Sequence, residues 1–211
     1  MKQREYWDSV SEKKEFTTPL QREAFVKYVK RTDVILDVGC GYGRTLNELH
    51  QAGFQNLIGV DFADGMIERG RQQFPQLDLR VKESERIDLP DNSVDAVILF
   101  AVLTCIWKNE EQERLIEEIR RVLKVDGVIY VNDYLLNNDD HNLPRYKKFS
   151  EKYGIYGVFE LPEGAVCRHH DLARVRTLLA GFEELEYEPL TFTTMNGNKS
   201  NGFYFIGKNV K

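Results

Sequence analysis

Short apolar runs alternate along the chain with segments whose apolar residues recur at helical spacing. The runs are rich in β-branched residues, which is typical of strands buried on both faces of a sheet. The segments between them have one apolar face and one charged face, as helices on a sheet do. This pattern predicts strands at residues 34–38, 57–61, 77–81, 94–100 and 128–133, and helices at 19–31, 44–53, 64–74 and 109–124.

Strands that alternate with helices in this way predict a parallel, doubly wound sheet with right-handed crossovers. The rhythm changes after residue 134, since residues 134–170 contain no predicted strand and only one helix, at 145–153. A helix at 171–179 and two strands at 183–188 and 203–206 follow. The connection between these strands contains a predicted Asn196-Gly197 turn and is too short for a crossover helix, so the strands should be antiparallel neighbours. The predicted fold class is α/β: a mostly parallel seven-stranded sheet with helices on both faces and an antiparallel last strand.

A chain of 211 residues fits a single domain. We expect residues 1–31 to form an N-terminal arm and a helix, and residues 134–170 to be an insertion that caps the substrate side. Connections as long as this insertion are more often functional than idle. The arm carries Tyr6, Trp7 and Phe16 among charged residues. These aromatic side chains either pin the arm to the body of the protein or form a lid over a ligand cleft.

Composition narrows the class of protein. The net charge of −5 argues against a broad nucleic-acid-binding surface, because non-specific affinity for nucleic acid comes mostly from Lys and Arg. No apolar run is long enough to span a bilayer, and the N-terminus lacks the apolar segment of a signal peptide. Cys40, Cys105 and Cys167 form no CxxC pair. We therefore expect a cytoplasmic protein with no structural disulfide and no metal site; the sequence does not indicate its oligomeric state.

A glycine-rich turn, Gly-Cys-Gly-Tyr-Gly at residues 39–43, follows the first strand and precedes a helix that starts at Arg44. Glycine is required where the backbone takes a positive φ or approaches a ligand closely, and the helix start offers free N–H groups. Asp61 ends the next strand about 20 residues later, where a carboxylate can accept hydrogen bonds from both ribose hydroxyls. Its structural alternative is a helix cap or turn residue. Two adenosine cofactors fit this layout, but the nicotinamide dinucleotide fingerprint needs a glycine where Arg44 stands.

The chain resembles the class I S-adenosylmethionine-dependent methyltransferases over residues 16–133. VILDVGCGYGRTLNEL is similar to their glycine-loop motif, and GVDFADGMIERG to their second-strand segment. KESERIDLPDNSVDAVILFAVL is similar to their adenine-contact loop and fourth strand, and EEIRRVLKVDGVIYVND to their next helix and fifth strand. The resemblance implies S-adenosylmethionine as the cofactor and methyl transfer as the activity. Two departures are Glu83, where the family usually has Asp, and Lys-Val-Asp-Gly at 124–127 in place of Lys-Pro-Gly-Gly.

The resemblance also implies roles for individual residues. Asp37 would hold the loop and the amino end of the cofactor, Asp61 would bind the ribose, and Glu83 would accept from the adenine amino group. The other implied contacts are Gly39, Cys40 and Gly41 beside the methionine part, Phe62 and Met66 flanking the adenine, the Ser84 backbone N–H at a ring nitrogen, and Phe100 and Ala101 closing the methionine side.

Methyl transfer from a sulfonium is an in-line displacement that depends on alignment, and it needs a general base only when the nucleophile holds a proton tightly. We expect the acceptor contacts in the arm, in residues 134–170 and in the connection 191–202, with Arg168 suited to an anionic substrate group. The catalytic candidates are Asp133, His141, His169 and His170. Their structural alternatives are a turn or cap for Asp133, a solvated loop for His141 and a helix cap for one of the paired histidines.

The sequence favours a small-molecule acceptor. The residues after the fourth predicted strand, Phe-Ala-Val-Leu at 100–103, lack the Asn/Asp-Pro-Pro-Tyr/Phe motif of the family members that methylate base amines. No proline precedes Cys105, unlike in the cytosine-carbon enzymes, so Cys40 and Cys105 are expected to be small core residues. The alternatives are an RNA or protein methyltransferase, a cofactor-binding module without turnover and a nicotinamide-dependent dehydrogenase.

Overall fold

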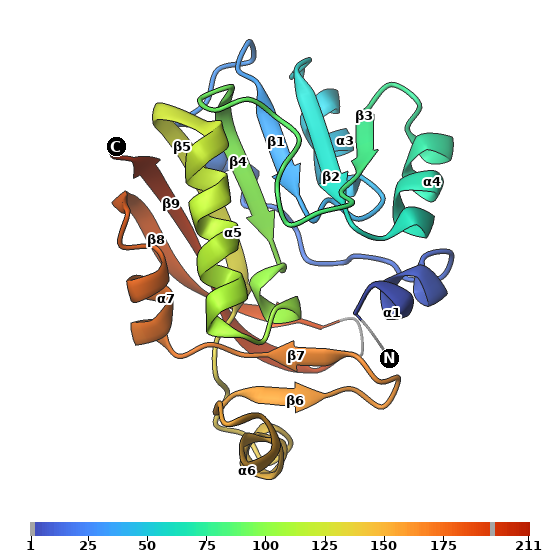
Figure 1. Ribbon diagram of the computed structural model, residues 1–211, viewed down its shortest axis with the longest axis vertical. Helices are drawn as coiled ribbons and strands as arrows, with labels where there is room; N and C mark the ends of the chain where they lie inside the picture. The colour runs from blue at the N-terminus through green and yellow to red at the C-terminus, as the bar shows by residue number, and fades with distance from the viewer. Residues whose placement is uncertain (1–2, 195–196) are drawn as a thin grey trace.

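The computed structural model describes residues 3–194 and 197–211 and contains a seven-stranded sheet (Figure 1). The strand order is β3-β2-β1-β4-β5-β9-β8, and neighbours are parallel except for β9, which runs antiparallel to both β5 and β8. The predicted fold class is therefore confirmed. The strands are β1 (Ile35–Val38), β2 (Leu57–Asp61), β3 (Asp78–Val81), β4 (Val94–Phe100), β5 (Leu123–Tyr134), β8 (Phe182–Thr193) and β9 (Lys199–Asn209).

Helices cover both faces of the sheet. Successive side chains of a strand point to opposite faces, so Ile35 and Leu36 of β1 belong to two different core clusters. Ile119 packs in the cluster on one face, and Leu46 in the cluster on the other. The helices on the first face are α5 (Asn109–Val122) and α7 (Leu172–Leu178); those on the second are α2 (Arg22–Phe25), α3 (Arg44–Gln51) and α4 (Asp64–Gln73).

A further group of elements lies beyond the carboxyl ends of the parallel strands (Figure 1). The N-terminal helix of the arm packs there against α4, and a two-stranded antiparallel sheet with its own helix lies across from it. A short 3-10 turn after β4 touches that small sheet. These elements are α1 (Gln3–Val10), η1 (Leu103–Cys105), α6 (Asn142–Tyr153), β6 (Val158–Glu160) and β7 (Val166–Arg168).

The small sheet corrects one sequence expectation, that residues 134–170 contain no strand. β6 and β7 pair from Val158 opposite Arg168 to Glu160 opposite Val166, and Gly164 turns the chain between them with a φ of +93°. Each strand is three residues long, which is too short for a period of two to be recognised in the sequence.

The helix expected at residues 19–31 is also wrong for most of its length, since only α2 forms. The Thr18 carbonyl accepts a hydrogen bond from Arg44 Nη2 at 2.7 Å, and the Gln21 N–H donates to Tyr130 Oη at 3.2 Å. After α2, Lys27 and Tyr28 form only three-residue turns. Contacts with the glycine-loop helix and with β5 thus replace the first turn of a longer helix.

Two remaining expectations concern the pairing of the last two strands and membrane-spanning segments. The antiparallel pairing of the last two strands is confirmed, while Asn196 of the predicted turn lies outside the described residues. None of the helices in the described part of the chain has the length and apolar character needed to cross a membrane.

Candidate active site

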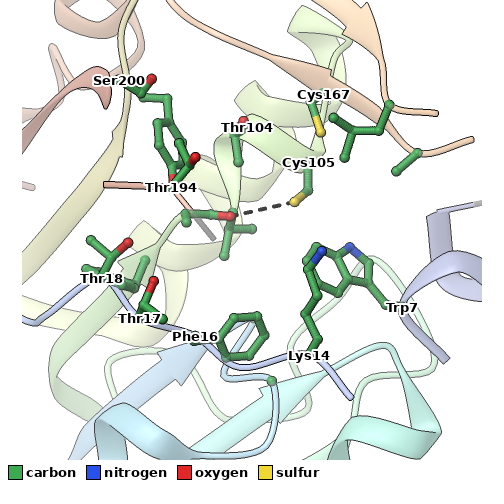
Figure 2. Close-up of a pocket in the computed structure, with 18 of the residues that line it drawn as sticks. Trp7, Lys14, Phe16, Thr17, Thr18, Thr104, Cys105, Cys167, Thr194 and Ser200 are labelled. Atoms are coloured by element: carbon green, nitrogen blue, oxygen red, sulfur yellow. Dashed lines mark hydrogen bonds between the residues drawn. The ribbon is translucent and has the colours of Figure 1, made fainter. Parts of the chain in front are cut away.

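A cavity of about 260 Å³ opens at the carboxyl ends of β1, β2 and β4. The arm forms one wall, and α6, β6, β7 and the β8–β9 connection form the opposite one. Figure 2 shows Trp7, Lys14 and Phe16 of the arm along one side of the cavity, with Thr104 and Cys105 of η1 opposite them. Of the cofactor contacts implied by the resemblance, the cavity is lined by Asp37, Gly39, Cys40, Gly41, Asp61, Phe62, Met66, Phe100 and Ala101.

The glycine loop after β1 approaches its surroundings too closely for side chains. Gly39 has a φ of +75°, and a Cβ there would lie 2.4 Å from Val102 Cγ2. Gly41 has a φ of +55°, and a Cβ there would lie 2.5 Å from Phe16 Cε2. Positive φ values suit glycine because other residues are strained there. The loop can therefore present bare backbone to a ligand.

Asp61 holds this loop in place. Its Oδ2 accepts the N–H of Gly41 at 2.9 Å, and its Oδ1 accepts the N–H of Ala63 at 2.9 Å. The pKa of the Asp61 carboxyl is raised by burial, although the backbone N–H donors oppose that rise. Asp61 therefore stabilises the turn, and it also lines the cavity.

Asp37, near the end of β1, carries an unsatisfied polar atom at this end of the cavity. The side chain is buried, and Oδ1 has no hydrogen-bond partner among the described residues. Burial, and next the negative charge of Asp61, raise the pKa of Asp37 from its usual 3.8 to about 7. A cationic ligand group beside Asp37 would relieve both effects. Two carboxylates beside a bare glycine loop therefore fit a ligand that carries positive charge and hydroxyl groups.

Ala101, just after β4, has a strained backbone. Its φ is +55°, a value rare for residues with a Cβ, and its N–H donates to the Asn132 carbonyl at 2.7 Å. Strain of this kind tends to persist at functional sites. Here it turns the chain from β4 along the cavity wall and into η1.

The arm is pinned to α4 and also lines the cavity, so its two interpretations are compatible. Arg69 donates to the carbonyls of Ser11 at 2.9 Å and Lys14 at 2.8 Å, and its guanidinium lies 3.9 Å from the Tyr42 ring centroid. Phe16 stacks on the same Tyr42 ring, with the two ring centroids 5.2 Å apart. The arm's backbone is thereby fixed while its aromatic side chains face the glycine loop.

His169 is the candidate base that the fold brings to the cavity in a buried position. Its Nδ1 lies 2.5 Å from Tyr146 Oη and 3.2 Å from Asn137 Nδ2. Its ring stacks on Tyr134, another lining residue, with centroids 5.4 Å apart. Burial, with a smaller contribution from the positive charge of Arg145, lowers the pKa of His169 from 6.5 to about 3. The imidazole is therefore neutral at neutral pH, and its Nε2 makes no hydrogen bond within the described residues.

Other sequence candidates lie away from the cavity. Glu83 and Ser84 are exposed in the bend after β3 and are not among its lining residues. Asp133 is buried behind η1, where its carboxylate accepts the N–H groups of Thr104 at 3.2 Å and Tyr134 at 2.8 Å. Burial raises the pKa of Asp133 to about 7. Ser84 Oγ donates to the Arg86 carbonyl at 3.2 Å, and none of these three residues is among the lining residues of the cavity.

His170 and Arg168 are likewise committed to neighbours. His170 Nε2 lies 2.8 Å from Gln112 Nε2, and Arg168 Nη1 donates to the Trp107 carbonyl at 2.9 Å and to Asn109 Oδ1 at 2.7 Å. The expectation that Arg168 faces an anionic substrate group is therefore wrong. Neither paired histidine caps α7, because the Asp171 carboxylate accepts the N–H that a cap satisfies.

The cavity also contains residues that sequence reasoning did not single out. His141, a candidate, does line it at the start of α6, but so do Lys14, Arg145 and Lys199. No motif marks these three cations, which belong to an arm, a helix and a strand that are distant in sequence. Only the three-dimensional arrangement brings them together.

Comparison with known proteins identifies the class. Residues 36–131 match the family described as "Methyltransferase domain". The chain is 27% identical over 111 residues to the eEF1A lysine and N-terminal methyltransferase of Bos taurus, and 29% identical over 175 residues to sterol 24-C-methyltransferase of Saccharomyces cerevisiae. These alignments cover 48% and 79% of this chain, but only 16% and 43% of the two relatives. The chain thus spans less than half the length of either relative.

A crystal structure of a SAM-dependent methyltransferase from Methanosarcina mazei has the same fold. It superposes with a TM-score of 0.84 at 24% identity, over 89% of this chain and 97% of that one. Residues 36–131 therefore match a methyltransferase domain, and the chain shares the fold of S-adenosylmethionine-dependent methyltransferases, whose cofactor is S-adenosylmethionine. The cavity fits that cofactor, because the unpartnered Asp37 carboxylate suits a cation and the glycine loop leaves room for a close ligand.

Proposed function

We propose that this protein transfers the methyl group of S-adenosylmethionine to a small molecule held between the glycine loop and the cap formed by α6, β6 and β7. The observation that carries the proposal is the lining of the far end of the cavity by the small sheet and α6. Phe159 and Leu161 of the small sheet and Asn142 of α6 line it there, while Thr17 and Thr18 of the arm line the adjoining wall. Walls contributed by both the arm and the cap support a small acceptor.

The chain's own residues would hold and align the reactants. When bound, S-adenosylmethionine supplies an electrophilic methyl group on a sulfonium sulfur, and displacement leaves a neutral thioether. Asp37 would hold the cationic end and Asp61 the ribose, while Gly39 and Gly41 allow the close approach. Phe16 would exclude water from the glycine-loop side. Alignment at near-attack distance is the main source of acceleration for such a displacement.

The acceptor end offers one buried group that can contact the acceptor directly through a ring nitrogen. His169 is neutral, and Tyr146 and Asn137 fix its Nδ1. Because the Asn137 amide N–H can only donate to Nδ1, Nε2 carries the ring proton and is positioned to donate a hydrogen bond that orients an acceptor. Asp133 and His170 lie behind the cavity wall, so they would position neighbouring residues and would not contact the acceptor.

Turnover with fractionated cell extract tests the proposal. The purified protein is incubated with S-adenosylmethionine, and formation of S-adenosylhomocysteine is measured with the dialysate, the protein fraction and the RNA fraction of the same extract. We expect product with the dialysate. Product with only the protein or RNA fraction would support the alternative acceptors. The protein fraction is included because the bovine relative is named a lysine and N-terminal methyltransferase. Binding of S-adenosylhomocysteine without product in any fraction would indicate a module without turnover.

A further inference from the structure

The carboxylates that line the cavity lie at one end of it, whereas cations line it at both ends. The carboxylates that line it are Asp37 and Asp61, both at the glycine loop. The cap side contributes Arg145 from α6 and Lys199 from β9, and no carboxylate within the described residues lines that side. The cap side of the cavity is thus positively charged, although the protein as a whole has a net charge of −5. A cationic subsite in an acidic protein indicates a ligand group of negative charge.

The cap cations have no carboxylate partners. Within the described part of the chain, neither Arg145 nor Lys199 makes an ion pair, and Lys199 Nζ bonds only to Thr193 Oγ1 at 2.8 Å. In contrast, Arg44, at the glycine-loop end, pairs with Glu48 at 2.5 Å. Arg145 is partly buried whereas Lys199 is exposed, and a partly buried cation without a counter-ion is unfavourable unless a ligand supplies one.

Arg145 is held so that its charge faces the cavity. The guanidinium lies 3.6 Å from the Phe159 ring centroid, and Nη2 donates to Asn142 Oδ1. Nη1 lies 3.4 Å from His141 Nε2, while Nε is buried and has no partner. Burial lowers the pKa of Arg145, although Tyr146 and the negative charge of Asp139 oppose that shift. A planar guanidinium fixed by an aromatic ring is well suited to bind a carboxylate.

The surrounding wall is apolar, which defines the rest of the ligand. Phe159, Leu161 and Ala165 line the cavity beside Arg145. A ligand that satisfies both features has an apolar body and one anionic group. Lys14 belongs to the arm, where its Nζ donates to Tyr6 Oη at 3.3 Å, so the cations that the cap itself contributes are Arg145 and Lys199.

We propose that the methyl acceptor is a small carboxylic acid with an apolar body, whose carboxylate binds Arg145 with support from Lys199. This inference rests on the proposed function, since it assigns the substrate class of the same cavity. It places the anionic group at the cap and leaves the nucleophilic atom of the acceptor facing the glycine loop.

Calorimetric titration of the protein saturated with S-adenosylhomocysteine tests the proposal, with benzoate, phenyl phosphate, benzamide and benzylamine as probes. We expect benzoate to bind more tightly than the other three. Arg145→Met should weaken benzoate binding at least about tenfold, because a charge-assisted pair is lost, while S-adenosylhomocysteine binds as before. Arg145→Lys should fall between the two. Lys148→Met, which removes an exposed cation from the same helix, is the matched control and should match the wild type.

The outcomes separate the two levels of the proposal. If S-adenosylhomocysteine itself does not bind, the proposed function fails. If it binds but benzoate binds no better than benzamide, or equally well to Arg145→Met, the substrate class is wrong. Preferential binding of phenyl phosphate or benzylamine also overturns it. Equal losses for benzoate and S-adenosylhomocysteine in Arg145→Met would assign Arg145 to the cofactor instead, and Lys199→Met provides an independent check if Arg145→Met is poorly folded.

Discussion

Asp37 provides a quantitative test of the cofactor end of the cavity. Its buried carboxylate has a pKa of about 7 in the folded protein against 3.8 ordinarily. Because one pKa unit equals about 1.4 kcal/mol, keeping Asp37 ionised costs the cofactor-free protein on the order of 4 kcal/mol. For an acid whose pKa is raised by folding, this cost is absent below pH 3.8, grows as the pH rises towards 7, and is complete above 7.

Asp37→Asn should therefore stabilise the cofactor-free protein in a pH-dependent way. Relative to the wild type, its free energy of unfolding should increase by roughly 2 kcal/mol more at about pH 8 than at about pH 5.5. Urea unfolding at the two pH values measures the difference. Asp88→Asn, which removes an exposed carboxylate outside the cavity, is the control for net charge and should show no such trend.

The same substitution should impair the ligand site. Calorimetry should show S-adenosylmethionine binding at least about tenfold more weakly to Asp37→Asn above neutral pH, because a charge-assisted interaction is lost. In the wild type, affinity should rise as the pH passes through 7, where Asp37 ionises. A stability difference that does not change with pH, together with unchanged affinity, would refute this role for Asp37.

Three further predictions concern other walls of the cavity. Asp61→Ala should raise the dissociation constant of S-adenosylhomocysteine at least about tenfold, since the ribose contact and the anchor of Gly41 are both lost; an unchanged constant in calorimetry would refute the assignment. Phe16→Ala should accelerate dissociation of S-adenosylhomocysteine in stopped-flow measurements, and equal rates would show that the arm does not retain the ligand. The rate of methyl transfer should show no inflection from His169 near pH 6.5, because its pKa is about 3; an inflection there that disappears in His169→Gln would contradict its buried, neutral state.

The central sheet could be predicted from sequence because its signals are local and repeated. The strand at residues 94–100 and the helix that starts at Asp64 agree with the structure at one or both ends, since β-branched runs and helical spacing act over many residues. The helix expected at 19–31 failed for the opposite reason. The backbone groups of Thr18 and Gln21 form hydrogen bonds with Arg44 and Tyr130, and no local sequence pattern predicts such contacts.

Some residues of the site could likewise be located from the sequence, and others could not. Asp37, Asp61 and the glycine loop could be located because they follow strands that the sequence defines. The cap could not be predicted in detail, because Arg145 acquires its position from Phe159 and His169 from Tyr146, pairs that are distant in sequence. His170 could not be distinguished from its neighbour His169, because burial of one ring behind the wall depends on Gln112 of another element.

A crystal structure of the protein with S-adenosylhomocysteine tests the cofactor placement most directly. We predict that the ligand's amino group lies within hydrogen-bond distance of Asp37, its ribose hydroxyls contact Asp61, and its sulfur faces the side of the cavity formed by Arg145 and His169. A ligand bound outside this cavity, or bound with its sulfur turned away from Arg145 and His169, would contradict both the cofactor site and the acceptor site derived from it.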